Sequence, residues 1–513
     1  MVTGPTSVRA SGGVPGGMQI VHRVLPAAPL VRLDDYLAAG GGVGLAAAQQ
    51  LDAAAMVALL DESGLRGRGG AGFPTGRKWA AVIENLAADT PATVVVNGAE
   101  GEPGTFKDRS ILRANPFLVL EGALIAALAV GAERVIVAIK ESFRQDAEVL
   151  ASAIAELRDA RWCDGITIEL FEGPRAYLFG EETALLEAID GRPPFPRLAP
   201  PYRRGVDEVV ELPSDVTSGS GLAAHVEMSG PGSASGAAPT LVDNVETLAN
   251  VAVVFGLGPD EFRSVGTAES PGTIVCTVTG SVATPGVAEV PMGTMLSEVL
   301  EKIGGGARDD HRIVAVLPGV SSAVVTAEHF DVALTYEAMA AIGSGLGSAG
   351  FVVFDDHDDM VAVAAGVSRF LYVESCGQCT PCKQDGGAIS ASLDDLLGGE
   401  LGDLERGAAL DRVRDRLDTV ADGARCSLAR QHETVVRSIL DAFPDVVTSY
   451  VDLPAPGRDR VLVGELVDVH DGITLLDETI LDRQPDWSDG PVDSGETPVE
   501  RFTDHRAGAV PLP

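Results

Sequence analysis

Four of the six cysteines constrain the fold of this chain more than any other feature of its sequence. Cys376, Cys379 and Cys382 form a C-x-x-C-x-x-C run, and Cys426 follows at a distance. Three thiolates on one tight loop can each bind a corner of a cuboidal iron–sulfur cluster, which leaves the last iron for a distant ligand. Structural zinc more often uses two separate C-x-x-C pairs. We therefore predict a 4Fe–4S cluster, with zinc or uninvolved thiols as the alternatives.

The remaining cysteines and the composition carry less information. Cys163 and Cys276 are single cysteines in apolar, strand-like surroundings, which is typical of buried thiols. The length of 513 residues favours roughly two to four domains. The formal net charge is −36, whereas binding to nucleic acid or to an anionic membrane surface requires a basic face. We therefore expect neither kind of partner.

No segment has the length and apolar character of a membrane span. The most apolar stretch, 117–130, is interrupted by Glu121 and is too short to cross a bilayer. The N-terminal residues include Arg9 but lack the apolar run of a secretory signal. We therefore expect a cytoplasmic protein without direct membrane insertion.

Strands alternate with helices in the first half of the chain. Short apolar runs at 93–96 and 135–139 are typical of strands, and 166–171 alternates like a strand. Helical patterns at 116–131 and 144–159 separate these segments. This alternation predicts an α/β domain with a largely parallel sheet.

The flanking segments differ in pattern. Residues 36–62 have a helical pattern, and the Ser-, Gly-, Ala- and Pro-rich stretch 213–238 is typical of a flexible surface loop. Strand-like and helical pieces within 273–303 predict a small α+β module. A helical pattern over 359–444 contains the cysteine run, and some strand-like pieces follow, among them 460–467.

A glycine-rich loop, G-R-G-G-A-G at 67–72, fits the pattern G-x-G-x-x-G. A Rossmann dinucleotide site needs a strand directly before this loop, whereas residues 53–60 have a helical pattern. The loop leads into a helix, and together with Arg68 and Lys78 it offers amides and cations to a phosphate-bearing ligand. A tight glycine connection with solvated basic residues is the alternative.

Two acidic motifs are candidate binding elements. V-V-N-G-A-E-G-E-P-G-T-F-K-D-R at 95–109 comes directly after a buried strand, and Y-L-F-G-E-E-T at 177–183 is the second. Ligands of α/β sheets bind outside the carboxyl ends of strands, where the first motif must lie. Carboxylates there can hold ribose hydroxyls and repel a 2′-phosphate. Solvated loop acids are the alternative for each motif.

Together these motifs resemble those of a known family. The segments G-L-R-G-R-G-G-A-G-F-P-T-G-R-K-W, N-G-A-E-G-E-P-G-T-F-K-D-R, G-E-E-T-A-L-L-E and P-T-L-V-D-N-V-E-T-L-A-N are similar, in this order, to the FMN- and NADH-binding segments of the NADH-binding subunit of respiratory complex I. E-S-C-G-Q-C-T-P-C with the distant cysteine resembles its 4Fe–4S site, and 273–306 resembles its β-grasp domain. The resemblance spans about residues 40–445.

The resemblance implies a fold class and an order of domains. It implies an α/β protein with a Rossmann-like FMN/NADH domain, a small β-grasp (SLBB-type) module and a C-terminal helical bundle that carries a 4Fe–4S cluster. The expected units are an N-terminal tail (1–35), the FMN/NADH-binding domain (36–265), the β-grasp domain (266–355), the helical 4Fe–4S domain (356–445) and a C-terminal extension of unknown role (446–513).

Carried over position by position, the resemblance also implies the binding residues. FMN is expected to contact Gly67, Arg68, Gly69, Lys78, Asn97, Glu100, Gly180, Glu181, Asn244 and Thr247. NADH is expected to stack near Phe73 and to contact Gly70, Ala71, Glu102, Tyr177 and Glu182. The expected cluster ligands are Cys376, Cys379, Cys382 and Cys426. Glu182 and Glu102 are expected to disfavour NADPH by repelling its 2′-phosphate.

The chain departs from the family pattern at five positions. Ala99 stands where the family usually has Asp, and Asp243 stands where it usually has Asn. Phe179, Ala199 and Lys383 replace a usual Cys, Lys and Arg. The first two departures are expected to affect the affinity for the flavin or its reduction potential. None of the five removes a cluster ligand.

The resemblance implies an NADH dehydrogenase (diaphorase) subunit. Hydride would pass from NADH to FMN, and single electrons would pass through the 4Fe–4S cluster to a partner. The implied partner is a 2Fe–2S thioredoxin-like subunit, within a larger redox complex that could attach the protein to the inner face of a membrane. One alternative is the diaphorase subunit of an NAD-linked formate dehydrogenase or hydrogenase. The others are a flavin-free iron–sulfur scaffold and a zinc-stabilised nucleotide-binding protein.

Overall fold

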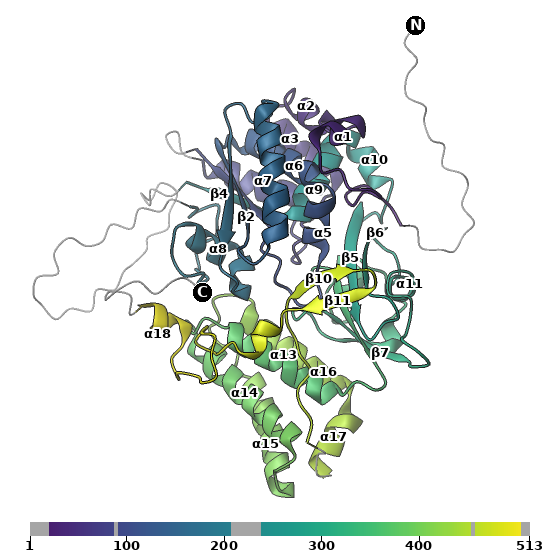
Figure 1. Ribbon diagram of the computed structural model, residues 1–513, viewed down its shortest axis with the longest axis vertical. Helices are drawn as coiled ribbons and strands as arrows, with labels where there is room; N and C mark the ends of the chain where they lie inside the picture. The colour runs from purple at the N-terminus through teal and green to yellow at the C-terminus, as the bar shows by residue number, and fades with distance from the viewer. Residues whose placement is uncertain (1–19, 87–90, 207–237, 453–456, 504–513) are drawn as a thin grey trace, which may run out of the picture.

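The computed structural model describes residues 20–86, 91–206, 238–452 and 457–503. Three packed units follow each other along the chain, and the last described residues run back over them (Figure 1). The predicted loop at 213–238 lies outside the described residues except for its last position.

A four-stranded parallel sheet in the order β3-β2-β1-β4 forms the centre of the first unit, as predicted. All residues of strand β1 except the last are buried, which is typical of a central strand in a sheet covered on both faces. Asn97 pairs in register with Asn244, so two carboxyl ends lie at one edge of the sheet. The strands are β1 (Thr93–Asn97), β2 (Arg134–Lys140), β3 (Thr167–Gly173) and β4 (Thr240–Asn244).

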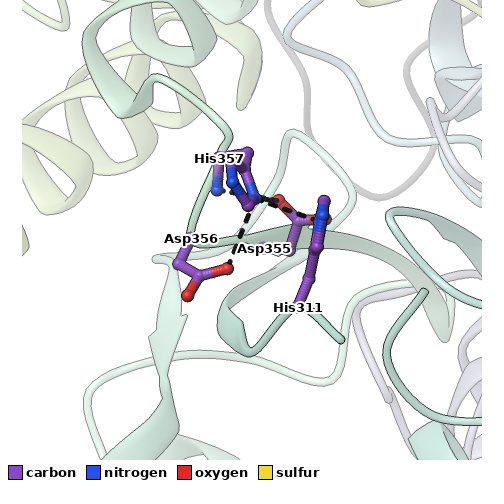
Figure 2. A group of neighbouring side chains, drawn as sticks. All are labelled: His311, Asp355, Asp356 and His357. Atoms are coloured by element: carbon purple, nitrogen blue, oxygen red, sulfur yellow. Dashed lines mark hydrogen bonds and ion pairs between the residues drawn. The ribbon is translucent and has the colours of Figure 1, made fainter. Parts of the chain in front are cut away.

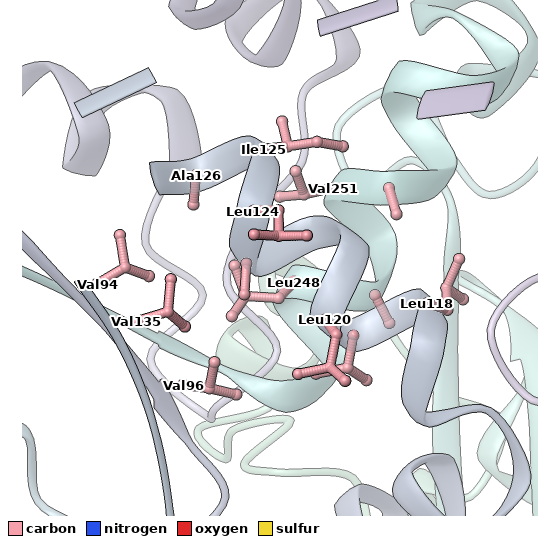
Figure 3. Packing of buried hydrophobic residues seen from close by; sticks show 14 of the residues in the cluster. Val94, Val96, Leu118, Leu120, Leu124, Ile125, Ala126, Val135, Leu248 and Val251 are labelled. Atoms are coloured by element: carbon pink, nitrogen blue, oxygen red, sulfur yellow. The ribbon is translucent and has the colours of Figure 1, made fainter. Parts of the chain in front are cut away.

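Helices α6 and α9 pack together beside this sheet. In Figure 3, Leu120 and Leu124 of α6 and Leu248 of α9 gather in one cluster beside the strand residue Val96. A Cβ on Gly122 would lie 1.9 Å from the carbonyl oxygen of Leu248, so the close approach of the two helices requires glycine there. The helices of this unit are α1 (Leu33–Ala38), α2 (Val43–Ala48), α3 (Ala53–Ser63), α4 (Thr75–Glu84), α5 (Lys107–Ala114), α6 (Pro116–Val130), α7 (Arg144–Asp159), η1 (Tyr177–Gly180), α8 (Glu182–Ile189), α9 (Val245–Leu257) and α10 (Pro259–Arg263).

The helical pattern at 36–62 corresponds to three helices rather than one. The chain breaks at Gly40 and Gly42, whose φ angles of 97° and 87° favour glycine. The buried Glu121 carboxylate accepts hydrogen bonds from the Tyr36 hydroxyl and from the N–H groups of Gly42 and Leu45. The charge that interrupts the apolar stretch therefore anchors this turn.

None of the described helices is by itself long and apolar enough to cross a membrane. Helices α5 and α6 pass the same test of length and composition only as a pair, and they are bent by 99° at their junction. Nearly every residue of α6 is buried against protein.

The second unit is a five-stranded mixed sheet in the order β6-β5-β9-β7-β8. Strands β5 and β9 are parallel, and their neighbours are antiparallel to them. Glu289 of β6 accepts the N–H groups of Val24 and Leu25, so the described part of the predicted N-terminal tail packs on this unit. The elements are β5 (Thr273–Gly280), β6 (Gly286–Pro291), α11 (Leu296–Lys302), β7 (Ile313–Pro318), β8 (Val325–Thr326), η2 (Ala327–His329), α12 (Tyr336–Ala341) and β9 (Gly350–Asp355).

The third unit is helical and positions the cysteines at helix ends. Cys376 follows the end of α13, Cys379 precedes α14, and Pro381 occupies the first turn of α14, where its missing N–H is not needed. Cys426 lies just before α16. The helices are α13 (Met360–Glu374), α14 (Thr380–Gly398), α15 (Asp403–Leu417), α16 (Leu428–Ala442) and α17 (Pro444–Asp452).

The predicted C-terminal extension is folded over its described length. Its first strand begins at Leu466, near the end of the strand-like piece 460–467. This strand pairs with the next strand of the extension to form a hairpin. We name residues 457–503 the C-terminal strap (yellow in Figure 1). Its elements are β10 (Leu466–His470), β11 (Ile473–Leu476), η3 (Glu478–Leu481) and α18 (Pro498–Thr503).

Acid should destabilise the third unit through one histidine. His432 is 1% exposed, its Nε2 lies 2.8 Å from Ser368 Oγ, and burial lowers the pKa of His432 to about 3. An unfolded histidine titrates near pH 6.5, so below that pH the unfolded state binds more protons. We expect the free energy of unfolding to fall as the pH drops, by about 3 kcal/mol at pH 4.

Urea unfolding between pH 7 and pH 4 measures this loss. In His432→Asn, the asparagine side chain does not titrate, so the free energy of unfolding should depend less steeply on pH. Equal slopes in the wild type and the variant would contradict the assignment.

Candidate functional site

A cavity of about 600 Å³ lies where the three units meet. Its volume falls within the range of roughly 300–1,000 Å³ that is usual for small-molecule sites. The first unit contributes the glycine loop at 69–71 and the strand ends at Asn97 and Asn244. Ligands bind at this edge of parallel sheets. The cavity also has walls from the second and third units, including Ser348 and Gln431.

A buried ion cluster forms one wall of the cavity. The Lys107 ammonium lies 2.8 Å from Asp108, 2.9 Å from Glu246 and 3.2 Å from the side-chain oxygen of Asn244. Burial raises the pKa of Asp108 to about 6, while the nearby carboxylates keep the pKa of Lys107 above its usual value. Lys107 and Asp108 line the cavity but were missed as site residues, although the motif that contains them was identified.

A second ion pair fixes the loop after β1. Glu100 lines the cavity and accepts the N–H of Asp108 at 2.8 Å and Nε of Arg109 at 3.0 Å. Both charged side chains are 2% exposed. The Glu100 carboxylate is therefore held by protein donors, and it shapes the wall rather than projecting freely from it.

Glu102 connects the first unit to the second. Its carboxylate accepts the Tyr177 hydroxyl at 2.6 Å and the Val320 N–H at 2.8 Å. Burial raises its pKa above the usual value. Glu102 and Tyr177 both line the cavity, and their predicted contact with NADH stays a prediction.

The second unit supplies a wall that the sequence did not predict. The Tyr336 hydroxyl donates to the carbonyl of Gly67 at 2.7 Å, and the hydroxyls of Thr105 and Ser348 lie 2.8 Å apart. The lining residues from this unit are Ser321, Ser322, Tyr336, Gly345, Leu346, Gly347 and Ser348. No motif marks them, because serines and glycines in loops are common.

Ten of the sixteen predicted cofactor-binding residues line the cavity. They are Gly69, Gly70, Ala71, Asn97, Glu100, Glu102, Tyr177, Gly180, Glu181 and Asn244. The other six do not line it, and they are Gly67, Arg68, Phe73, Lys78, Glu182 and Thr247.

The Arg68 side chain is buried and bonded to the protein backbone. Its guanidinium donates to the carbonyls of Arg66, Pro271 and Thr273, and it is buried between the glycine loop and β5. Its N–H donates to the Thr247 hydroxyl at 2.8 Å. The donors of the Arg68 side chain therefore already have protein acceptors, and its expected role as a cation for a phosphate stays a prediction.

Lys78 and Glu182 form an ion pair with each other outside the cavity lining. The Lys78 ammonium also lies 3.8 Å from Asp243, whose other oxygen accepts the Trp79 indole N–H at 2.9 Å. The departure at Asp243 thus faces helix α4 and not the cavity. By contrast, Ala99 is buried in the cavity wall itself, and Phe73 is half exposed.

The four predicted cluster ligands face one small cavity. Cys376, Cys379, Cys382 and Cys426 all line it. Burial and the neighbouring thiols raise the pKa of Cys426 to about 12, and the pKa of Cys382 is also raised. Four converging thiols in an apolar pocket match the donor set of a 4Fe–4S cluster, whose metal charge would hold them as thiolates.

The two cavities share a wall. Leu178, Cys426 and Leu428 line both the large cavity and the thiol pocket. A ligand in the large cavity and a cluster on the cysteines would therefore be separated by single side chains.

Sequence comparison finds three matched regions along the chain. Residues 60–253 match the Nuo51 FMN-binding domain, 275–325 match the SLBB domain, and 362–450 match the NADH-ubiquinone oxidoreductase-F iron-sulfur binding region. The second F-type subunit of NADH-quinone oxidoreductase in Rhizobium meliloti is 37% identical over 68% of this chain and 79% of its own length. The F-type subunit of the Aquifex aeolicus oxidoreductase is 32% identical over 82% of this chain and 91% of its own length. This chain belongs to the family of F-type subunits of NADH-quinone oxidoreductase.

This F-type family also has relatives in hydrogenases. The HndC subunit of the NADP-reducing hydrogenase of Solidesulfovibrio fructosivorans is 35% identical over 82% of this chain and 81% of its own length. A chain in the crystal structure of NAD⁺-reducing [NiFe]-hydrogenase in the H₂-reduced state is 29% identical, with a TM-score of 0.69, and the match covers 84% of this chain and 69% of that chain.

Membership of the F-type family confirms the predicted fold class and cofactors. The protein is an FMN- and NADH-binding oxidoreductase subunit with a 4Fe–4S region. Homologues are subunits of multisubunit redox complexes, which confirms the prediction that the protein works within a larger redox complex.

A further group of donor atoms lies where β7 begins and β9 ends (Figure 2). His311 Nδ1 lies 2.7 Å from Asp355 and 3.1 Å from Nδ1 of His357. The side chain of His357 is 70% exposed and Arg308 lies 3.6 Å from the Asp355 carboxylate. A neighbouring guanidinium opposes a divalent cation, so we interpret this group as a surface ion-pair network that joins β7 to β9.

Proposed function

We propose that this chain oxidises NADH in the large cavity and passes electrons, one at a time, to its four-cysteine site and then to a partner subunit. The shared wall of Leu178, Cys426 and Leu428 carries this proposal, because it brings the nucleotide cavity within one side chain of the cysteines. When bound, FMN supplies the conversion from two-electron to one-electron transfer.

The protein's own residues would bind and orient the ligands. The glycine loop at 69–71 leaves room for close approach of a ligand to the backbone. Asn97 and Asn244 offer amide groups at the strand ends, and Lys107 adds a buried positive charge. Glu102 and Tyr177 offer a carboxylate and a hydroxyl that suit ribose hydroxyls. No side chain needs to act as a general acid or base for hydride transfer.

We further propose a 2Fe–2S thioredoxin-like subunit as the electron acceptor, in a complex that operates inside the cell. The chain offers ligands for one cluster, so the electrons require an external acceptor. A role as the diaphorase subunit of a hydrogenase is the second candidate, and its support is the hydrogenase relatives. The identity of the co-purified subunits distinguishes the two candidates.

An anaerobic absorption spectrum before and after addition of NADH tests the proposed reaction. Flavin bands that NADH bleaches, over a broad shoulder near ~400 nm, are the expected result. A shoulder without flavin bands would instead favour the flavin-free scaffold and would mean that Ala99 marks loss of the flavin site.

Glu102→Gln is expected to lower the selectivity for NADH over NADPH. The interaction of two charges at 4 Å is worth about 1 kcal/mol in water and about 4 kcal/mol near a protein surface, so we expect at least a roughly fivefold loss. Glu182→Gln should have a smaller effect, because Glu182 pairs with Lys78 outside the cavity lining. Steady-state kinetics with both nucleotides measures the ratio of kcat/KM values.

Glu102 should also make the selectivity for NADH over NADPH depend on pH. Because burial raises the pKa of Glu102, its carboxylate becomes neutral at a higher pH than an exposed glutamate would. Selectivity should therefore decline as the pH falls towards this raised pKa, and the decline should be absent in Glu102→Gln. A wild-type selectivity that does not change with pH would count against the role of Glu102.

A further inference from the structure

The C-terminal strap lies beyond the matched regions, the last of which ends at residue 450. It leaves the helical unit, reaches the FMN/NADH-binding unit and strand β6 of the second unit as the hairpin β10–β11, and returns to the cysteine loop as α18 (Figure 1). At its start, the N–H of Val461 donates to the carbonyl of Ala362 in α13 at 3.1 Å. A Cβ on Gly366 of the same helix would lie 2.1 Å from the Val461 carbonyl oxygen, so the strap lies directly on α13.

The hairpin end of the strap anchors behind the cavity wall. Glu465 forms an ion pair with Lys140, whose side chain is 2% exposed, and the Leu466 carbonyl accepts from Arg109 at 2.5 Å. Arg109 in turn holds the cavity residue Glu100. A Cβ on Gly101 would lie 2.5 Å from the Lys140 ammonium, which places this ion pair directly behind the cavity lining.

The returning part of the strap anchors on the cysteine loop. Trp487 is buried and its indole N–H donates to the Val373 carbonyl at 3.0 Å. The Lys383 ammonium donates to the carbonyl of Pro485 at 2.5 Å and to that of Ser375 at 2.8 Å. The N–H of Val499 donates to the carbonyl of Cys376 at 3.0 Å.

Two further observations place the strap against the cysteine loop and the cavity. Gly377 has a φ of +86°, and a Cβ there would lie 2.5 Å from Thr497, so the strap crosses directly over this residue. Arg483 lies 3.1 Å from Glu374, both 6% exposed or less. The other oxygen of Glu374 accepts the N–H of Tyr177, which lines the nucleotide cavity.

We propose that the C-terminal strap is a positioning element of the redox site, which holds the cysteine loop against the cavity wall and covers its Cys376–Gly377 side. This inference rests on the proposed function and adds Arg483 and Glu465 as positioning residues. Without them, Glu374 and Lys140 would be buried charges without their strap partners. Such a change opens the local structure, because an unpaired buried charge is costly.

The first test follows cluster lifetime in the purified holoprotein. Arg483→Gln should accelerate the loss of cluster absorbance in air by about tenfold or more, because it leaves Glu374 without its strap partner. Arg483→Lys keeps the charge and should recover most of the lifetime. Arg430→Gln changes an exposed arginine just beyond Cys426 and is the matched control. Equal rates in wild type and Arg483→Gln, or equal acceleration in the control, would overturn the proposal.

The second test uses the unmodified protein, so it does not depend on a variant that folds. If the strap stabilises the cluster, the cluster must stabilise the strap to the same extent. Hydrogen exchange of residues 484–503 should therefore be slower in the holoprotein than after removal of the cluster. Identical exchange would overturn the proposal. A wild type that binds no cluster or flavin would instead contradict the proposed function.

Discussion

Cys426→Ala is expected to abolish the 4Fe–4S cluster while leaving a flavin that NADH still reduces. The side chain is the predicted distant ligand of the set, and it lines both cavities. Loss of one thiolate leaves one iron without its protein ligand, so we expect about three irons per chain or fewer instead of about four. The nucleotide cavity would keep its glycine loop and its ion clusters.

Iron analysis, absorption and electron paramagnetic resonance after NADH addition measure this separation. Flavin bleaching should persist while the signal of the reduced cluster disappears. Cys163→Ala is the control, because this half-buried cysteine lies outside the thiol pocket and should leave the iron content unchanged. Full iron content in Cys426→Ala would mean that another group is the fourth ligand.

Lys107→Met is expected to unfold much of the protein or to empty it of FMN. The ammonium is 1% exposed and lies within 3 Å of the carboxylates of Asp108 and Glu246. Methionine keeps the approximate volume but leaves these carboxylates without their cation. Breaking a buried ion pair in this way costs about 3–5 kcal/mol, a large part of the stability of a typical domain.

Thermal unfolding and FMN content of the purified variant test this expectation. Lys302→Met is the matched control, because Lys302 is exposed at the end of α11 and does not line the cavity. The control should melt within a few degrees of the wild type. A Lys107→Met protein that melts with the control and keeps its FMN would contradict the electrostatic role of Lys107.

Much of the candidate site was predictable because its determinants are local in sequence. The three loop cysteines lie within one short segment, so their spacing alone predicts convergence on a cluster. The motif at 95–109 follows a strand, and the carboxyl ends of parallel strands form the ligand edge of such sheets. This rule predicts Asn97, Glu100 and Glu102 at the cavity, where the structure places all three.

The predicted residues that lie outside the cavity, and the lining residues that were missed, depend on where side chains point. The position of Arg68 in a glycine loop predicts a phosphate ligand. In the structure its guanidinium donates hydrogen bonds to carbonyls of β5 and of the turn before β5. The pairing of Lys78 with Glu182 joins helix α4 to helix α8. A sequence pattern cannot show such pairings, because the partners lie far apart along the chain.

The sequence by itself determined the cofactors, and it predicted the cluster ligands and the order of the three units, because short motifs with strict chemical requirements carry both the chemistry and the family resemblance. Only the tertiary structure decided that the β-grasp unit forms part of the nucleotide cavity and that Leu178, Cys426 and Leu428 separate it from the thiols. Only the tertiary structure also showed that the C-terminal strap joins two units. The physical reason is that these features are contacts between distant segments. Burial and charge pairing stabilise them, and neither leaves a local pattern in the chain.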